Sequence, residues 1–485
     1  MTSQGGESAE CLLTGQFKSD IVAGVAEIVP AGPRPDRGPN HVWRQLRLWL
    51  KPGIGVKRWL LLMVLGTALI GLGLAYILLD LYRANPDSGF LAAISLTVLP
   101  RWARALLLGA AGIALLLLGG FRLNRTLLAP FMRPGRPVVD AVAEYRRLGR
   151  GPKVVAIGGG NGLATLLRGL KQHTTNLTAI VTVADDGGSS GRLRRDLGLP
   201  PPGDVRNCLA ALSDDEDLLT QLFQYRFLEG AGLEGHSFGN LFIAALAGVT
   251  GSFDRGVLEA GRVLRIRGQV LPATLSDVAL VADKTPALDA QTVRVQGESR
   301  IPDFPGRIYR VHLDPGEPPA FPEAIRALLG ADMIVIGPGS LFTSVLPNLL
   351  VPDLAQAIRA SRAFKVYVCN VAAQPGETDG FDCAQHLAAL ESHIGPGLVD
   401  GMLVNTRVPS QLPARVQLVP LTEGETPAVP TFPADVLEFD RPWRHDSEKL
   451  AHVLLRLLEE RTGPLDMTPI DQAQSLGHLN GSHSQ

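Results

Sequence analysis

The stretch that decides the fold runs from Lys153 to Lys171 and reads KVVAIGGGNGLATLLRGLK. Its first residues form a short apolar run, which is typical of a buried strand, and the residues after Gly162 have the apolar spacing of a helix. The turn between them, Gly158–Gly162, is rich in glycine, so its backbone N–H groups can approach a phosphate at the start of a helix. The stretch therefore predicts the first unit of a ligand-binding α/β sheet. The alternative is a tight turn that holds no ligand.

Two common nucleotide-binding motifs are absent from the chain. The dinucleotide motif G-x-G-x-x-G lacks its last glycine, because Leu163 or Thr165 stands where that glycine belongs. The chain contains no G-x-x-x-x-G-K-[ST], which argues against a P-loop NTPase. The glycine turn alone is therefore only a weak indication of a nucleotide.

The pattern of an apolar run followed by a turn and a helix recurs downstream. Continuous apolar strands that alternate with helices predict a doubly wound, Rossmann-like parallel sheet covered on both faces. Between these strands, residues 212–268 look mainly helical, and residues 269–313 look like short strands of a small added sheet. In a doubly wound sheet, ligands bind outside the carboxyl ends of the strands. The further predicted strands are Ala179–Ala184, Asp332–Ile336, Lys365–Asn370 and Leu398–Asn405.

Composition excludes several classes of protein. The 485 residues are 46% hydrophobic and 19% charged, so the chain can bury a large core and wholesale disorder is excluded. The net charge of -1 argues against a nucleic-acid partner. None of the four cysteines has C-x-x-C spacing, which argues against a zinc knuckle or a disulfide scaffold.

The N-terminal part of the chain has the composition of a membrane module. Residues 59–79 and 105–121 are uncharged apolar runs that predict a hairpin of two transmembrane helices within residues 41–135. Basic residues before the first run and after the second place both ends of the hairpin in the cytoplasm. The predicted location is therefore the cell membrane, with a multi-pass anchor in the bilayer and an α/β domain of residues 150–462 in the cytoplasm. Residues 1–40 and 463–485 are predicted to be flexible tails.

Acidic residues follow the second predicted strand and the turn after it. Asp185 and Asp186 lie among glycines and serines, where carboxylates could accept ribose hydroxyls, hold a divalent cation or activate a hydroxyl. Asp204 opens a helix with Arg206 and Asn207 behind it. The structural alternatives are a solvated Asp-Gly turn and a helix N-cap, respectively. The three aspartates are the candidate catalytic residues.

Four further motifs lie where the predicted sheet would present them to a ligand. Gly337–Ser340 offers a second anion-binding loop, and His236–Asn240 and Gln374–Thr378 carry polar groups close to helix starts. Arg444–Asp446 could bring a late arginine to the ligand, with a surface salt bridge as the alternative. None of these motifs is a G-x-S-x-G elbow, so a hydrolase serine is disfavoured.

Taken in order, these blocks resemble the YvcK family. This group, the gluconeogenesis factors, is a branch of the CofD-like superfamily. The resemblance covers residues 153–455 through VVAIGGGNGLATLLRGLK, AIVTVADDGGSSGRLR, PPGDVRNCLAAL, GHSFGNLFIAAL, GPGSLFTSVLPNLLV and YVCNVAAQPGET. It implies a Rossmann-like fold, binding of a UDP-sugar, notably UDP-N-acetylglucosamine, and a role in cell shape and wall synthesis during gluconeogenic growth.

Carried over by position, the resemblance also implies the ligand contacts. Two departures stand out: the glycine loop more usually has Thr where this chain has Asn161, and the segment before Gln374 usually reads Met-Thr rather than Ala372-Ala373. Asn161 keeps its hydrogen-bonding capacity, whereas the missing hydroxyl at Ala373 puts chemistry there in doubt. The implied ligand-binding residues are Gly158, Gly159, Gly160, Asn161, Gly162, Asp185, Asp186, Asp204, Asn207, Asn240, Gly337, Pro338, Gly339, Ser340 and Arg444.

Three functions follow as hypotheses. The first is a membrane-tethered regulator that binds a UDP-sugar, requires no cofactor and acts beside cell-wall synthesis proteins. The second is a CofD-like enzyme that transfers 2-phospho-L-lactate from a guanosine diphosphate conjugate to a deazaflavin with Mg²⁺. The third, a dinucleotide oxidoreductase, is weakened by the missing third glycine. Homo-oligomerisation stays open.

Overall fold

The computed structural model describes residues 148–214, 218–286, 291–421 and 429–463, together with scattered helical residues between 65 and 118. The chain divides into two compact units, Met1–Tyr145 and Arg146–Gln485. The predicted tails, residues 1–40 and 463–485, lie outside the described residues except for Gly463. The second unit contains residues 150–462, the predicted α/β domain.

The α/β unit is built on a seven-stranded sheet in the order β10-β9-β8-β7-β1-β2-β3, and every pairing in it is parallel. Strands are added outward from β1 in one direction and from β7 in the other. The order therefore reverses between these two strands, which is the topological switch point of a doubly wound fold. The strands are β1 (Val154–Gly158), β2 (Leu177–Val181), β3 (Gln269–Pro272), β7 (Met333–Ile336), β8 (Phe364–Val368), β9 (Gly401–Asn405) and β10 (Thr431–Ala434).

Side chains of the sheet alternate between two hydrophobic cores. Val155 and Ile157 of β1 belong to one core, and Val154 and Ala156 belong to the other. The first core is covered by α13 (Pro322–Leu329), α14 (Leu346–Leu349), α15 (Pro352–Ala360) and α16 (Cys383–Ile394). The second is covered by α7 (Gly160–Leu170), α9 (Gly203–Leu212), α10 (Leu218–Gln224), α11 (Phe238–Thr250), α12 (Phe253–Val263) and α17 (Ser447–Thr462). Helix α8 (Gly188–Leu197) connects β2 to α9.

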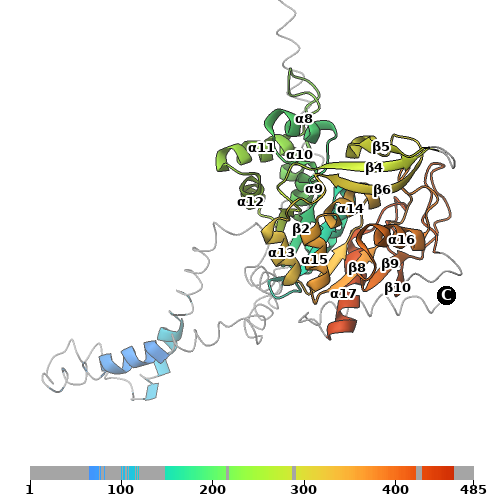
Figure 1. The fold of residues 1–485 in the computed structure, drawn as a ribbon. Coiled ribbons are helices and arrows are strands. Elements are labelled where there is room, and N and C mark those ends of the chain that lie inside the picture. The colour runs from blue at the N-terminus through green and yellow to red at the C-terminus, as the bar shows by residue number, and fades with distance from the viewer. Residues whose placement is uncertain are drawn as a thin grey trace, which may run out of the picture. The chain divides into compact units, whose positions relative to one another are not determined.

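A small antiparallel sheet with the strand order β5-β4-β6 is added to this layer structure. It consists of β4 (Ala279–Thr285), β5 (Val293–Gln296) and β6 (Arg307–Asp314), which Figure 1 shows side by side. Its buried residues, such as Leu280 and Val311, join the first core. The structure thus has the small added sheet that residues 269–313 predict, and its strands lie within residues 279–314.

Two edge strands of the main sheet differ from the sequence prediction. Gln269–Pro272 is not part of the added sheet, because it pairs in parallel with β2 as β3. The strand β10, Thr431–Ala434, was not predicted. Its four residues include Pro433, which cannot donate a backbone hydrogen bond and is tolerated because β10 has a neighbour on only one side.

The predicted membrane hairpin falls mostly outside the described residues. Within it, Leu65–Ala75 is a short apolar helix, and its side chains Leu69, Ile70 and Leu74 are exposed. Among the residues that the structure describes, no single helix combines the length and hydropathy needed to cross a membrane. The hairpin therefore stays a prediction.

Candidate functional site

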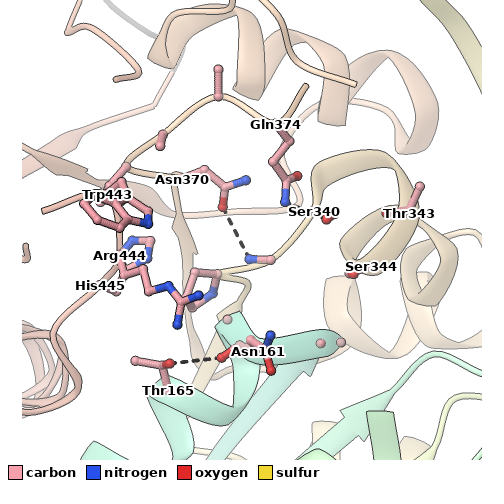
Figure 2. A pocket seen from close by; sticks show the side chains of 18 of the residues that line it. Asn161, Thr165, Ser340, Thr343, Ser344, Asn370, Gln374, Trp443, Arg444 and His445 are labelled. Atoms are coloured by element: carbon pink, nitrogen blue, oxygen red, sulfur yellow. Dashed lines mark hydrogen bonds between the residues drawn. The ribbon is translucent and has the colours of Figure 1, made fainter. Parts of the chain in front are cut away.

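A cavity opens at the carboxyl ends of β1 and β7, on the switch point of the sheet. Its volume is about 640 Å³, which is in the range of sites for drug-sized ligands. Figure 2 shows side chains of the loops after β1, β7 and β8 converging on it. It is lined by Gly159, Gly160, Asn161, Gly162, Thr165, Thr182, Asp185, Asp204, Glu298, Pro338, Gly339, Ser340, Thr343, Ser344, Asn370, Val371, Ala372, Ala373, Gln374, Pro375, Arg415, Val416, Trp443, Arg444 and His445.

The two glycine-rich loops pack directly on each other. A Cβ atom on Gly162 would lie 2.5 Å from the carbonyl oxygen of Pro338, so only glycine lets the loops approach this closely. Gly160 has a φ of 61°, in the left-handed region that favours glycine. Asn348 adds a link from α14, since its Nδ2 donates to the carbonyl oxygen of Gly158 at 3.0 Å. The glycines therefore let both loops pack together and form one wall of the cavity.

Side chains after β8 hold the second loop in place. The backbone N–H of Gly339 donates to Oδ1 of Asn370 at 3.3 Å, as the dashed line in Figure 2 shows. Nε2 of Gln374 donates to Oγ of Ser340 at 2.6 Å. The loop then enters the π-helical turn Leu341–Val345, a geometry that is frequent at functional sites.

Internal carboxylates occupy the helix N-termini at the cavity. The carboxylate of Asp204 accepts a hydrogen bond from the backbone N–H of Gly160, at the start of α7. The carboxylate of Glu377 accepts hydrogen bonds from the N–H groups of Phe342 and Thr343, in the π-helical turn. These carboxylates therefore lie where an anion would otherwise meet the N–H groups, which leaves side-chain donors as the groups open to an anion.

Three more acidic groups lie together beside Asp204. One carboxylate oxygen from each of Asp185, Asp186 and Glu298 lies within 4.8 Å of the corresponding oxygens of the other two residues. Backbone N–H groups orient two of them: Gly187 donates to Oδ1 of Asp185 at 2.8 Å, and Ser299 donates to Oδ1 of Asp186 at 2.9 Å. Carboxylate oxygens at this spacing are ligands that a divalent cation such as Mg²⁺ accepts.

The electrostatics of this cluster also fit a cation. Burial raises the pKa of Glu298 to about 8, and the charges of Asp185 and Asp204 add to the rise. Burial, again with the charge of Asp185, raises the pKa of Asp204 to about 6. Burial raises the pKa of Asp185 as well. Crowded, buried carboxylates disfavour one another's ionised form, and a bound cation would offset that repulsion.

Cationic and aromatic groups form the opposite side of the cavity. Asp185 follows β2 whereas Asn370 follows β8, and these strands flank the β1–β7 pair on opposite sides. Trp443 and Arg444 lie on the β8 side, where Nε2 of His445 donates to the carbonyl oxygen of Cys369 at 3.3 Å. Figure 2 shows the guanidinium of Arg444 reaching toward the start of α7. The cavity is therefore acidic at one end and basic at the other.

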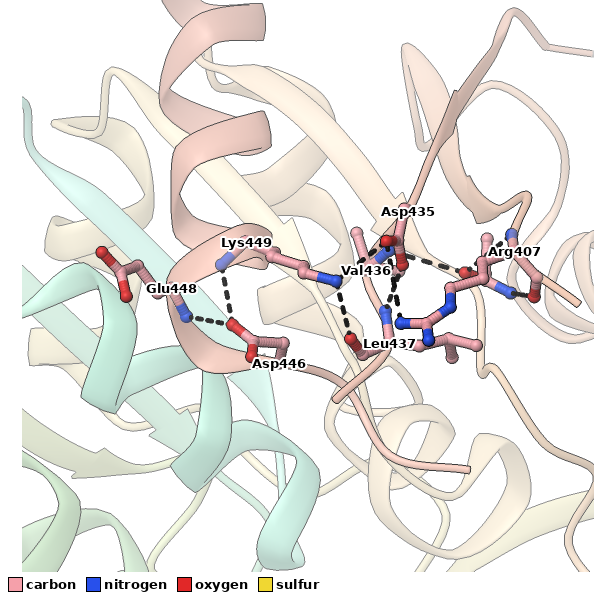
Figure 3. A network of polar contacts seen from close by, with 8 residues as sticks. Arg407, Asp435, Val436, Leu437, Asp446, Glu448 and Lys449 are labelled. Carbon is pink, nitrogen blue, oxygen red and sulfur yellow. Dashed lines mark hydrogen bonds and ion pairs between the residues drawn. The ribbon is translucent and has the colours of Figure 1, made fainter. Parts of the chain in front are cut away.

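A polar network fixes the segment that carries Arg444 (Figure 3). Asp446 caps α17, because its Oδ1 accepts from the N–H groups of Glu448 at 3.0 Å and Lys449 at 2.9 Å. Nζ of Lys449 then donates to Oδ2 of Asp435 at 2.8 Å, just after β10. Among the described residues, the exposed guanidinium of Arg444 has no ion-pair partner, so the salt-bridge alternative for this motif receives no support.

The structure brings most of the predicted site residues together. Ten of them line the cavity: Gly159, Gly160, Asn161, Gly162, Asp185, Asp204, Pro338, Gly339, Ser340 and Arg444. The other five do not line it. The N–H of Gly337 links β7 to the carbonyl oxygen of Ile157 in β1, and the carbonyl oxygen of Gly158 accepts from Thr182 and Asn348. Asp186 belongs to the acidic cluster, Asn207 accepts from Arg206, and Asn240 donates to Ser189 and Ser190.

Several lining residues were not predicted. Asn370 ends the predicted strand Lys365–Asn370, so its place at the carboxyl edge was available from the pattern. Glu298, Arg415 and Trp443 do not come directly after a strand of the main sheet, and they belong to no motif. Only the folded chain brings them to the cavity.

Comparison with known proteins agrees with this geometry. A family model described as 2-phospho-L-lactate transferase CofD matches residues 154–461. The gluconeogenesis factor of Bacillus subtilis is 46% identical over 328 residues, which cover 64% of this chain and 100% of that protein. A Nostoc relative that also bears the gluconeogenesis factor name is 50% identical over 382 residues, 76% of this chain and 81% of its own.

Solved structures lead to the same family. A crystal structure of a UPF0052 family member from Bacillus halodurans is 46% identical and has a TM-score of 0.58. The match covers 63% of this chain and 99% of the Bacillus halodurans chain. With the switch-point cavity, the family match and these relatives all in agreement, the chain belongs to the CofD-like family, in the gluconeogenesis factor (YvcK/UPF0052) branch.

Proposed function

We propose that the cavity binds a nucleotide-sugar, with UDP-N-acetylglucosamine as the leading ligand, and that the protein acts as a regulator rather than a catalyst. The observation that carries this proposal is the position of Arg444 at the switch point, where it has no ion-pair partner in the described part of the chain and faces two glycine-rich loops that meet in one cavity. A diphosphate is the part of a nucleotide that a guanidinium binds, and the carboxyl edge at a switch point is where nucleotides bind in doubly wound sheets.

The contacts suggest which groups of the cavity would bind each part of the ligand. Because Asp204 and Glu377 already accept from the helix N-termini, the diphosphate would take hydrogen bonds from the guanidinium of Arg444 and from the side-chain hydroxyl of Ser344. Sugar or ribose hydroxyls would donate to carboxylates at the acidic end. The ring of Trp443 offers an apolar face for a base or a sugar.

A second candidate function rests on the acidic cluster. Asp185, Asp186 and Glu298 could hold Mg²⁺ against a diphosphate, as a CofD-like transferase requires, and the family model bears that enzyme's name. The substrate pair would be a guanosine diphosphate conjugate of 2-phospho-L-lactate and a deazaflavin. This alternative predicts turnover, whereas the regulator predicts binding alone.

One titration separates these functions. Thermal unfolding of the full-length protein is followed with UDP-N-acetylglucosamine, with UDP and with the guanosine-linked donor, each with and without Mg²⁺. Ligand at a hundred times its Kd is expected to stabilise the protein by about 2.7 kcal/mol, seen as a rise in Tm. Intact UDP-N-acetylglucosamine after incubation supports the regulator, and release of GMP in the presence of a deazaflavin supports the transferase. No rise in Tm with any of these compounds would remove the proposal.

We also propose that the N-terminal unit tethers the protein to the cell membrane, close to cell-wall synthesis enzymes that the regulator would serve. The support is the uncharged run of residues 59–79 and the exposed apolar side chains of the helix Leu65–Ala75, which water solvates poorly. After cell fractionation, the protein is expected in the membrane pellet and to resist extraction by alkaline carbonate. Recovery in the soluble fraction would count against a tether.

A further inference from the structure

A lysine is fully buried in the added sheet, away from the cavity lining. Lys284 of β4 has 0% of its surface exposed. Its Nζ donates to three backbone carbonyl oxygens: that of Ile301 at 2.8 Å, that of Phe304 at 2.5 Å and that of Gly376 at 2.9 Å. An ammonium group has three N–H donors, so these three acceptors satisfy it completely.

The three carbonyls belong to two segments that are distant in sequence. Ile301 and Phe304 come directly after the 3-10 turn Glu298–Arg300, and Glu298 lines the acidic end of the cavity. Gly376 comes two residues after Gln374, whose Nε2 holds Ser340 of the second glycine loop. The ammonium of Lys284 is thus a shared anchor for two walls of the cavity.

Two nearby carboxylates stabilise the charged form of the Lys284 ammonium. Burial lowers the pKa of Lys284, and the negative charges of Glu377 and Asp379 oppose that change. Charge-assisted hydrogen bonds to carbonyls are stronger than neutral ones, and the loss of their donor would leave three buried carbonyls without this partner.

We infer that Lys284 is a positioning residue for the ligand site, since its ammonium fixes the segments that carry Glu298 and Gln374. Lys284 itself is not among the residues that line the cavity. Gln374 is a sensitive target for such positioning, because its Oε1 is buried without a hydrogen-bond partner among the described residues and is an acceptor for a ligand. The expected effect of Lys284 on ligand affinity rests on the proposed function, whereas its role as an anchor of the two segments does not.

The test compares two buried lysines. Lys171 is 3% exposed, and its Nζ donates to the carbonyl oxygen of Ser213 at 2.8 Å, at the C-terminal ends of α7 and α9. Both Lys284→Met and Lys171→Met are expected to lower Tm. Only Lys284→Met is expected to weaken UDP-N-acetylglucosamine binding, by at least tenfold, and to speed amide hydrogen exchange in residues 298–304 and 374–379 together.

A double-mutant cycle separates positioning from general loss of stability. In a Gln374→Ala background, Lys284→Met is expected to weaken binding by less than it does in the wild-type protein, because part of its effect acts through Gln374. Should Lys284→Met fail to fold, Lys284→Gln, which keeps two N–H donors, takes its place.

The outcomes distinguish this inference from the proposed function. Unchanged exchange in both segments of a folded Lys284 variant overturns the positioning role, whatever the ligand. If the wild-type protein binds no nucleotide-sugar, the proposed function fails, while faster exchange in both segments of the variant still supports the anchor. Equal losses of affinity in the Lys284 and Lys171 variants would also overturn the inference.

Discussion

Replacing Arg444 by alanine is expected to weaken binding of UDP-N-acetylglucosamine by about ten- to hundredfold, because hydrogen bonds to charged groups contribute about 1.5–3 kcal/mol. The Tm of the unliganded protein should stay the same, since the exposed guanidinium has no ion-pair partner among the described residues. Isothermal titration gives the affinity, and Arg444→Lys should recover only part of it, since an ammonium lacks the planar fork.

Arg441 provides a control from the same segment. It is exposed, its Nη2 lies 2.7 Å from Oε1 of Glu438, and it does not line the cavity. Arg441→Ala should therefore bind the ligand as the wild-type protein does. If Arg444→Ala binds equally well, the basic end of the cavity is not the diphosphate site.

The second large effect concerns the contact between the two glycine-rich loops. Gly162→Ala places a methyl group 2.5 Å from the carbonyl oxygen and 2.8 Å from the carbonyl carbon of Pro338. Alanine is favoured over glycine inside a helix by about 0.5–1 kcal/mol, but overpacking against backbone costs about 1–3 kcal/mol. The cost of the clash should exceed the gain in helix propensity. We therefore expect a lower Tm together with a loss of ligand binding as the loops separate.

Gly248 in α11 is the matched control, because a Cβ on it meets nothing within 4 Å. Gly248→Ala should leave binding intact and raise Tm slightly, as helix propensity alone predicts. A Gly162→Ala protein with the wild-type affinity and Tm would show that the loops need not touch.

How far the sequence predicts the fold depends on burial. The strands at the centre of the sheet are continuous apolar runs, so β1, β7 and β8 could be located within a residue or two. The edge strands β3 and β10 have four residues each and contain proline, so their composition does not separate them from loops. Their pairing is decided by contact with β2 and β9, which no local pattern encodes.

The candidate site divides in the same way. Residues that follow a buried strand, such as Gly159 and Ser340, could be placed by the rule that ligands bind at the carboxyl edge of the sheet. Glu298 reaches the cavity from the added sheet, and Trp443 reaches it from the segment before α17. Positions of this kind depend on tertiary packing, so spacing alone could not reveal them.

The internal carboxylates at the helix N-termini affect discrimination among anions. The carboxylate of Asp204, whose pKa of about 6 leaves it mostly ionised at pH 7, would repel a small free anion that makes no other contact. Inorganic phosphate, although abundant in cells, should therefore be a poor competitor. A phosphate group would bind only as part of a larger molecule whose neutral portion makes further contacts in the cavity. The carboxylates would thus select against inorganic phosphate without any moving segment.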